Sequence, residues 1–210
     1  MKKIGTSFLK DAVRFLNANA RMLLLGVLFL LGVVIGISLL NGNSPLIGEY
    51  SRKIAQDNVS QRLEQSFLTA ALYMFLAFLP FALVSYLAGL CAVGSVLSAA
   101  LPLFKGIGYG LSVSFFYVTF GAQGIAYSAL MILPHQFLCA LALILMSRES
   151  MRFSRLITRN ITPGQQGINL WNDFKLYSLR FVCFLVIPLL SSFLGAFLST
   201  AFSGFFTFNI

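Results

Sequence analysis

Residues 22–40, MLLLGVLFLLGVVIGISLL, decide the fold of this chain, because they form an uncharged run long enough to cross a bilayer. A transmembrane helix needs ~20 consecutive, mostly apolar residues. Comparable runs occupy residues 67–87, 125–146 and 181–200, and the whole chain is 58% hydrophobic and 10% charged. Such a chain would expose too much apolar surface in water. The sequence therefore predicts an all-α, polytopic integral membrane protein with a single membrane domain over residues 1–210.

The positions of lysine and arginine indicate the orientation, since short cytoplasmic loops are enriched in these residues. Basic residues dominate residues 1–21 and 147–178, whereas residues 41–66 hold equal numbers of basic and acidic residues. We therefore expect a cytoplasmic basic amphipathic segment over residues 1–21, an external loop over residues 41–66 and a cytoplasmic basic loop over residues 147–178.

The stretch between residues 66 and 147 must then contain an odd number of crossings, and its ~80 residues accommodate three better than one. One of the three, residues 93–120, is interrupted by Pro102, Lys105 and several glycines. The prediction is about five transmembrane helices, one of them bent or membrane-dipping. The N-terminus is expected in the cytoplasm and the C-terminus outside.

Each basic segment allows two interpretations. Residues 1–21 suit either a helix that lies on the inner leaflet or a flank that only sets the topology. The second contains four arginines at spacings of four, three and four, which place them on one helix face: Arg148, Arg152, Arg155 and Arg159. This stripe suits inner-leaflet anionic lipids or an acidic cytoplasmic partner, and the positive-inside bias alone also explains it. Because that bias accounts for the net charge of +9, nucleic acid is not an expected partner.

The first apolar run contains a pair of glycines, Gly32 and Gly36, at the spacing that lets two helix backbones approach closely. One interpretation is self-association into a homo-oligomer, and the other is packing inside the chain. Internal packing is favoured, because a protein with five spans must also pack its own helices.

The stretch Phe104-Lys105-Gly106, followed by Gly108 and Gly110, is the most unusual part of the sequence. It places a cation in an apolar region with no nearby acid. The favoured interpretation is that Lys105 extends to the cytoplasmic interface, with residues 93–104 dipping into or bending within the membrane and a short crossing after them. The alternative is that carbonyls or a distant carboxylate meet Lys105 inside the bundle.

Leu133-Pro134-His135 lies in the next apolar run and contains the only histidine of the chain. An ionisable group inside a membrane is a functional candidate by default. Pro134 also frees a carbonyl on the preceding turn, and His135 is equally suited to donate a hydrogen bond to it. Both interpretations remain open.

The inventory of polar residues argues against ion-coupled transport and catalysis. Between Glu64 and Glu149 the chain contains no carboxylate, and intramembrane acids are what most ion-coupled carriers depend on. The single histidine has no HExxH partner, and the chain contains neither a GxSxG elbow nor a P-loop. We therefore expect no catalytic residues, no metal site and no cofactor.

The order of these features resembles the stage II sporulation protein M family. The resemblance rests on the basic N-terminus, one span, an external loop, the Phe104-Lys105-Gly106 turn with its trailing glycines, and Leu133-Pro134-His135. In many broader members a glycine follows the histidine and a glutamate lies four residues after it. Here Gln136 and Cys139 occupy those places, which is closer to the sporulation branch.

The resemblance implies a non-enzymatic scaffold in the cytoplasmic membrane of an endospore-forming bacterium, at the septum or in the mother-cell membrane. Its expected partners, besides membrane lipids, are membrane-anchored peptidoglycan hydrolases that act during forespore engulfment. In the external loop, four apolar residues at spacings of four, five and four form an imperfect helical stripe for such a contact: Tyr50, Ile54, Val59 and Leu63. A hairpin that packs on its own membrane domain explains them equally well.

The alternative function is that of a transporter's membrane subunit. Proline and glycine interrupt neighbouring spans, as they do in the broken helices of carriers. Lys105 and His135 would attract an anion, and a separate ATPase would drive transport without an intramembrane carboxylate.

Overall fold

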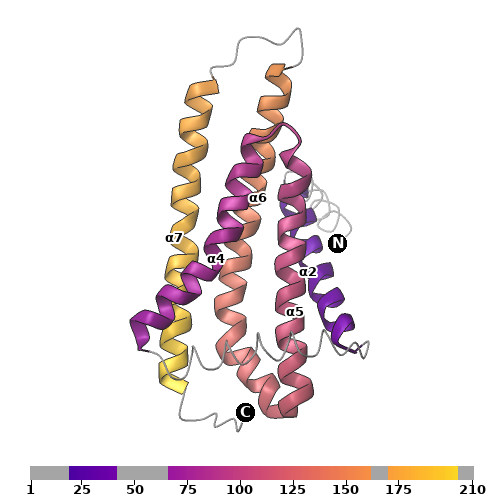
Figure 1. Ribbon diagram of the computed structural model, residues 1–210, viewed down its shortest axis with the longest axis vertical. Helices are drawn as coiled ribbons and strands as arrows, with labels where there is room; N and C mark the ends of the chain where they lie inside the picture. Colours follow the sequence, from indigo (N-terminus) through magenta and orange to yellow (C-terminus); the bar gives the residue numbers. More distant parts are fainter. Residues whose placement is uncertain (1–18, 42–65, 162–169, 203–210) are drawn as a thin grey trace, which may run out of the picture.

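The computed structural model describes residues 19–41, 66–161 and 170–202, and every regular element in these ranges is helical. The order is α2 (Ala20–Asn41), α4 (Phe67–Leu90), α5 (Gly94–Tyr127), the π-helical turn η1 (Ser128–Ile132), α6 (Leu133–Ile161) and α7 (Leu170–Phe202) (Figure 1). Within these ranges, 4 helical stretches are long and apolar enough to cross a membrane. The prediction of an all-α, polytopic membrane protein is therefore confirmed.

The longest of these stretches, residues 94–160, passes along the bundle twice because it folds back on itself. At Gly121 the backbone takes φ 56° and ψ −130°, a conformation that side chains strongly disfavour. Gly124 completes the turn, since a Cβ atom there would overlap the carbonyl oxygen of Phe116. α5 and α6 therefore run antiparallel and side by side, and the described helices make five passes.

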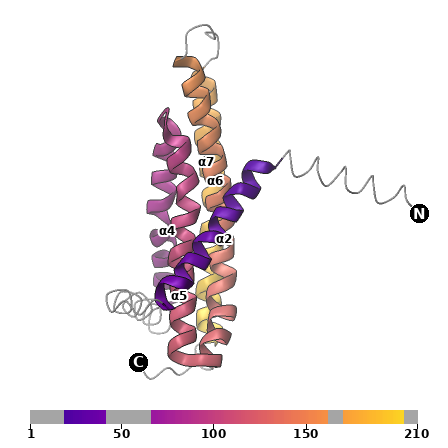
Figure 2. The same ribbon diagram turned by 90° about the vertical axis from the view of Figure 1, so that its right-hand side faces the viewer.

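The main core lies where α4, α5, α6 and α7 meet. Its buried side chains include Phe78, Leu101, Leu143, Met146, Phe153 and Tyr177. α2 lies outside this core, diagonally across α5 (Figure 2), and it leaves Leu30 and Val34 62% and 59% exposed. Large apolar side chains on an outer helix face are what a lipid-facing surface requires.

The prediction of one bent segment is confirmed, but the bend does not lie within residues 93–104. α5 continues through Pro102, which is buried, and the bend falls at Gly121 instead. A proline inside a helix removes one backbone donor. The backbone of α2 lies against α5 on both sides of Lys105, directly after this proline.

Residues 147–178 are not a loop over the part that the structure describes. α6 continues to Ile161 and α7 begins at Leu170, so the basic residues lie on two helical extensions. The ring of Phe153 on α6 stacks on that of Tyr177 on α7, with centroids 4.6 Å apart. This tertiary contact stabilises helices whose sequences are too polar to suggest a membrane span.

Except for Lys105, the charged residues that the structure describes lie toward one end of the bundle, where α2, α5 and α7 begin and α4 and α6 end (Figure 1). These residues are Arg21, Arg148, Glu149, Arg152, Arg155, Arg159, Asp173, Lys175 and Arg180. We call this the basic end. The Gly121 turn, the start of α4 and the end of α7 form the opposite end, which has no charged residue in the described ranges.

Candidate functional site

The two glycines of α2 lie against the backbone of α5. A Cβ atom at Gly32 would overlap the carbonyl oxygen of Leu103, and one at Gly36 would overlap that of Ile107. Only glycine permits this approach, because any side chain would have to displace backbone rather than a flexible neighbour. The structure therefore uses this face inside the chain.

The glycines of α5 complete the same contact from the other side. A Cβ atom at Gly106 would overlap the carbonyl oxygen of Phe29, and one at Gly110 would overlap that of Val33. Gly108 differs, because nothing lies within 4 Å of its added Cβ atom. Two of the three glycines after Lys105 are thus required by helix packing.

Lys105 lies 11 residues after Gly94, about 16 Å along α5 at 1.5 Å per residue. Its Nζ atom stands 4.9 Å from the ring centroid of Phe81 on α4, while the neighbouring Phe104 is 60% exposed. The cation thus meets an aromatic face, a contact that contributes about 2 kcal/mol when desolvated. Neither interpretation from sequence included this arrangement, since nothing in the sequence distinguishes Phe81 from the other phenylalanines.

His135 ties α6 to α7. Its ring is 3% exposed, and Nδ1 lies 3.0 Å from both the carbonyl oxygen and the hydroxyl oxygen of Ser191. The Ser191 hydroxyl in turn donates to the carbonyl oxygen of His135 at 2.8 Å. Nδ1 is therefore the protonated nitrogen that donates. The acceptor of this hydrogen bond belongs to α7.

Small and sulfur-containing residues surround the His135 ring. A Cβ atom at Gly195 would come within 3.2 Å of His135 Cγ and 2.9 Å of Met74 Sδ, so glycine makes room for both side chains. Cys139 Sγ lies 3.9 Å from His135 Nε2 and 3.8 Å from the Ser191 hydroxyl. Leu133 at the start of the motif is 49% exposed and belongs to the outer surface.

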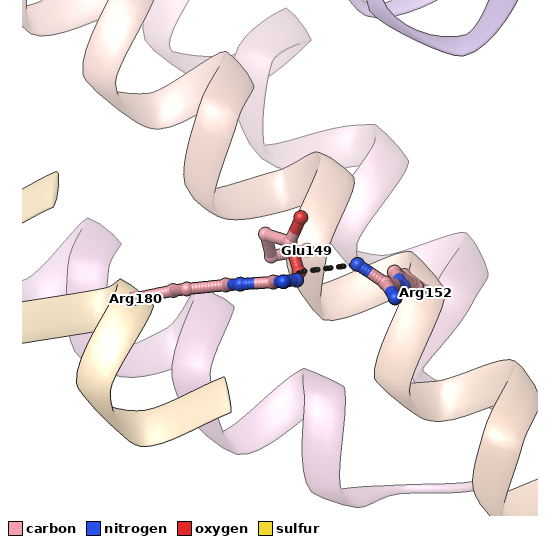
Figure 3. A network of polar contacts seen from close by, with 3 residues as sticks. All are labelled: Glu149, Arg152 and Arg180. Carbon is pink, nitrogen blue, oxygen red and sulfur yellow. Dashed lines mark hydrogen bonds and ion pairs between the residues drawn. The ribbon is translucent and has the colours of Figure 1, made fainter. Parts of the chain in front are cut away.

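A carboxylate links α6 to α7 near the basic end. Glu149 accepts a hydrogen bond from Arg180 at 3.0 Å and lies 3.7 Å from Arg152, one turn further along its own helix (Figure 3). The Glu149 side chain is 16% exposed, which places the pair at the edge of the packed interior. Sequence reasoning had identified Arg152 but not its carboxylate partner.

Two tyrosines join α4 to α7 beside this ion pair. The Tyr177 hydroxyl donates to the carbonyl oxygen of Tyr86 at 2.9 Å, and the Tyr86 hydroxyl lies 2.9 Å from Ser178 Oγ. The two rings stack with centroids 5.2 Å apart. Sequence reasoning had not paired Tyr86 with Tyr177.

Hydroxyl groups of α6 hold the turn between α4 and α5. Ser154 donates to the carbonyl oxygen of Cys91 at 2.8 Å, and Thr158 donates to that of Ala92 at 2.9 Å. Ser150, one turn earlier, donates to the carbonyl oxygen of Ser85. The spacing of these hydroxyl residues by four places them on one helix face, and that pattern was the available signal for this contact.

The four arginines of the α6 stripe lie on one continuous helix, but they differ in their neighbours. Arg152 lies in a groove between α6 and α7 that is also lined by Glu149, Phe153, Leu156, Asp173, Leu176, Tyr177 and Arg180. Arg148, Arg155 and Arg159 do not line this groove. Arg155 Nε donates to the carbonyl oxygen of Met151 at 2.9 Å. Arg152 and Arg155 thus have different immediate partners.

Several predicted residues lie outside the described ranges. These are residues 1–18 and the four apolar residues of the external loop, Tyr50, Ile54, Val59 and Leu63. Their roles stay predictions. Within residues 19–41, 66–161 and 170–202, no group of 3 or more His, Cys, Asp or Glu side chains is arranged to hold a metal ion.

Comparison with known families decides which kind of membrane protein this is. The model of stage II sporulation protein M matches residues 25–203, from the first turns of α2 past the end of α7. The chain belongs to the stage II sporulation protein M family. The match includes the paired glycines of α2 and α5, Lys105 and His135.

Membership in the stage II sporulation protein M family confirms the resemblance seen in the sequence. It implies a membrane protein of sporulation engulfment, in a family that is generally non-catalytic. No curated protein and no solved structure matches the chain.

Proposed function

We propose that this protein is a non-enzymatic membrane scaffold that recruits membrane-anchored peptidoglycan hydrolases to the septum during forespore engulfment. Family membership carries the proposal. The way the bundle uses its intramembrane polar groups supports it, since the Lys105 ammonium rests on an aromatic ring and the His135 imidazole binds Ser191. Groups engaged in holding helices together suit a platform better than a site that must bind and release a substrate.

The distribution of charge supports an orientation for this scaffold. By the positive-inside bias, the basic end faces the cytoplasm and the opposite end faces the cell wall. The external loop over residues 41–66 then lies on the side where wall hydrolases act. We propose that its apolar residues contact the hydrolase, and that exposed faces of the spans hold the partner's membrane anchor.

A binding experiment with the full-length chain tests the proposal. Tagged protein is purified from a sporulating host with and without the triple substitution Tyr50→Ala, Ile54→Ala and Leu63→Ala, and co-purified hydrolases are measured. We expect the hydrolase to be lost from the triple variant and kept by the matched control Gln56→Ala with Gln61→Ala, which removes polar side chains from the same loop. Hydrolase recruitment that survives the triple substitution would remove this contact surface.

The permease alternative has its own readout. Lys105→Met and His135→Asn are expected to leave hydrolase recruitment unchanged. In the scaffold proposal these residues pack the bundle and do not contact the hydrolase. A transporter would instead lose solute uptake with either substitution. Genes beside this one give a second criterion, since sporulation genes favour the scaffold and an ATPase gene favours the permease. Cation-driven solute flux by the purified protein in vesicles would contradict the scaffold proposal.

A further inference from the structure

Arg21, Arg155 and Arg159 bring three positive charges together at the basic end from two helices. Arg21 lies in the first turn of α2, and the other two lie one turn apart on α6. α2 contacts α6, and the charges of Arg21 and Arg159 both act on the Arg155 guanidinium. We call these three residues the arginine cluster.

The guanidinium of Arg155 has a hydrogen-bonding requirement that the described residues leave unmet. Its Nε donates to the carbonyl oxygen of Met151, but its Nη2 is buried without a hydrogen-bond partner. An unpaired buried donor is destabilising, and more so on a charged group. Like charges one helical turn apart also repel each other. Both effects are relieved by an anion that accepts a hydrogen bond at this point.

The carboxylates of the described residues do not supply that anion. They are Glu149 and Asp173, and both line the groove between α6 and α7, where Glu149 binds Arg180 and Arg152. Arg155 does not line this groove. A guanidinium fork matches a phosphate group in geometry and charge, so a phosphate suits the arginine cluster.

The position of the arginine cluster indicates where the phosphate comes from. From Leu133 to Arg155, α6 rises about 33 Å, which is close to the ~30 Å thickness of the hydrocarbon core. Arg155 therefore reaches headgroup level when α6 enters the bilayer near Leu133. On α2, the exposed apolar residues Leu23 and Leu24 lie within one turn of Arg21. A molecule with a phosphate at the arginines and acyl chains along α2 fits both surfaces.

We propose that the arginine cluster binds the phosphate of an anionic phospholipid and thereby holds the start of α2 against α6. The bound lipid would complete a contact that protein groups alone leave electrostatically unfavourable. This inference is independent of the hydrolase partner, because it concerns the other end of the bundle.

Lipid titration of the purified full-length chain tests the inference. The melting temperature is followed in a neutral detergent as phosphatidylglycerol is added, and the midpoint of the rise gives an apparent Kd. Arg21→Gln, Arg155→Gln and Arg159→Gln are each expected to weaken binding about 5-fold, equivalent to about 1 kcal/mol per basic residue. Arg21 and Arg159 are exposed. Their variants therefore test the site even where Arg155→Gln lowers the yield of folded protein.

Matched controls separate this site from a diffuse positive surface. Arg152→Gln makes the same change in charge one turn away, where the arginine faces Glu149, and it is expected to leave the Kd unchanged.

Three results would overturn the inference. Equal weakening by Arg152→Gln would indicate general attraction to basic residues, and an equal response to phosphatidylcholine would exclude recognition of headgroup charge. The same shift with inorganic phosphate would identify the ligand as a soluble anion instead of a lipid.

Discussion

At the scale of single residues, the positions that matter most are those where a side chain is absent. Gly32 and Gly36 on α2 meet Gly106 and Gly110 on α5, and the added Cβ atoms would overlap backbone oxygens. In a membrane, helices associate by close packing, because lipid tails are as apolar as the side chains they replace. These four glycines therefore determine how α2 joins the bundle.

Gly106→Ala is expected to lower the free energy of unfolding by about 1–3 kcal/mol, because the new methyl group must push α2 away from α5. The measurement is unfolding of the purified protein in mixed micelles. Gly108→Ala is the matched control, since it makes the same change two residues away in open space. It is expected to have no effect or to stabilise slightly through helix propensity. If both variants lost the same free energy of unfolding, the effect of the added methyl group would not come from contact with α2.

The polar residues inside the bundle show what sequence reasoning could not predict about single residues. Lys105 and His135 were recognisable from the sequence as candidates, but their partners were not. Phe81 and Ser191 lie on other helices, and neither belongs to a motif. A hydrogen bond or ring contact between distant positions leaves no local pattern, so sequence reasoning could identify the polar group and not what satisfies it.

At the scale of elements, the reversal between α5 and α6 makes two passes from one apolar stretch. The turn depends on the backbone of Gly121 more than on its surroundings, because nothing lies within 4 Å of an added Cβ atom there. Two buried aromatic residues, Phe116 and Tyr127, pack across the turn with centroids 4.9 Å apart. The sequence indicated a bend in this region, but it drew attention to Pro102 instead of Gly121.

Gly121→Ala is expected to destabilise the protein by about 1–3 kcal/mol, because an L-residue is strained at φ 56° and ψ −130°. Thermal unfolding in detergent measures the effect against Gly108→Ala, which adds the same methyl group to a helical glycine with free space around it. A melting temperature equal to that of Gly108→Ala would show that the turn relaxes to another conformation at no cost.

At the scale of the whole molecule, the charged residues of the described helices are distributed asymmetrically, since all of them except Lys105 lie toward the basic end. Five passes place the start of α2 and the start of α7 at the same end, and the arginines follow that arrangement. The positive-inside bias then orients the molecule as one unit.

Labelling of single cysteines tests this orientation. In a Cys183→Ser background, exposed Cys91 at the turn between α4 and α5 is expected to react with a membrane-impermeant thiol reagent only after cells are opened. The paired variant adds Ala122→Cys at the exposed Gly121 turn and replaces Cys91 with serine. It is expected to react in intact cells. The reverse pattern of labelling would invert the topology, and labelling of both from one side would contradict the five passes.

The sequence by itself determined the class of the protein, the approximate limits of its apolar runs and the bias of its charges. These properties depend on local quantities, namely the length of uncharged segments and the positions of lysine and arginine along the chain. The sequence also contains the two motifs that carry the family resemblance, around Lys105 and His135.

Only the tertiary structure decided that α5 runs unbroken past Pro102, that the glycines of α2 meet those of α5, and that Arg155 is separated from the groove that contains Arg152. Each of these facts depends on which helix lies next to which. Helices that are apolar on nearly every side find their neighbours through shape and a few polar contacts between distant residues, and hydropathy along the chain does not encode that choice.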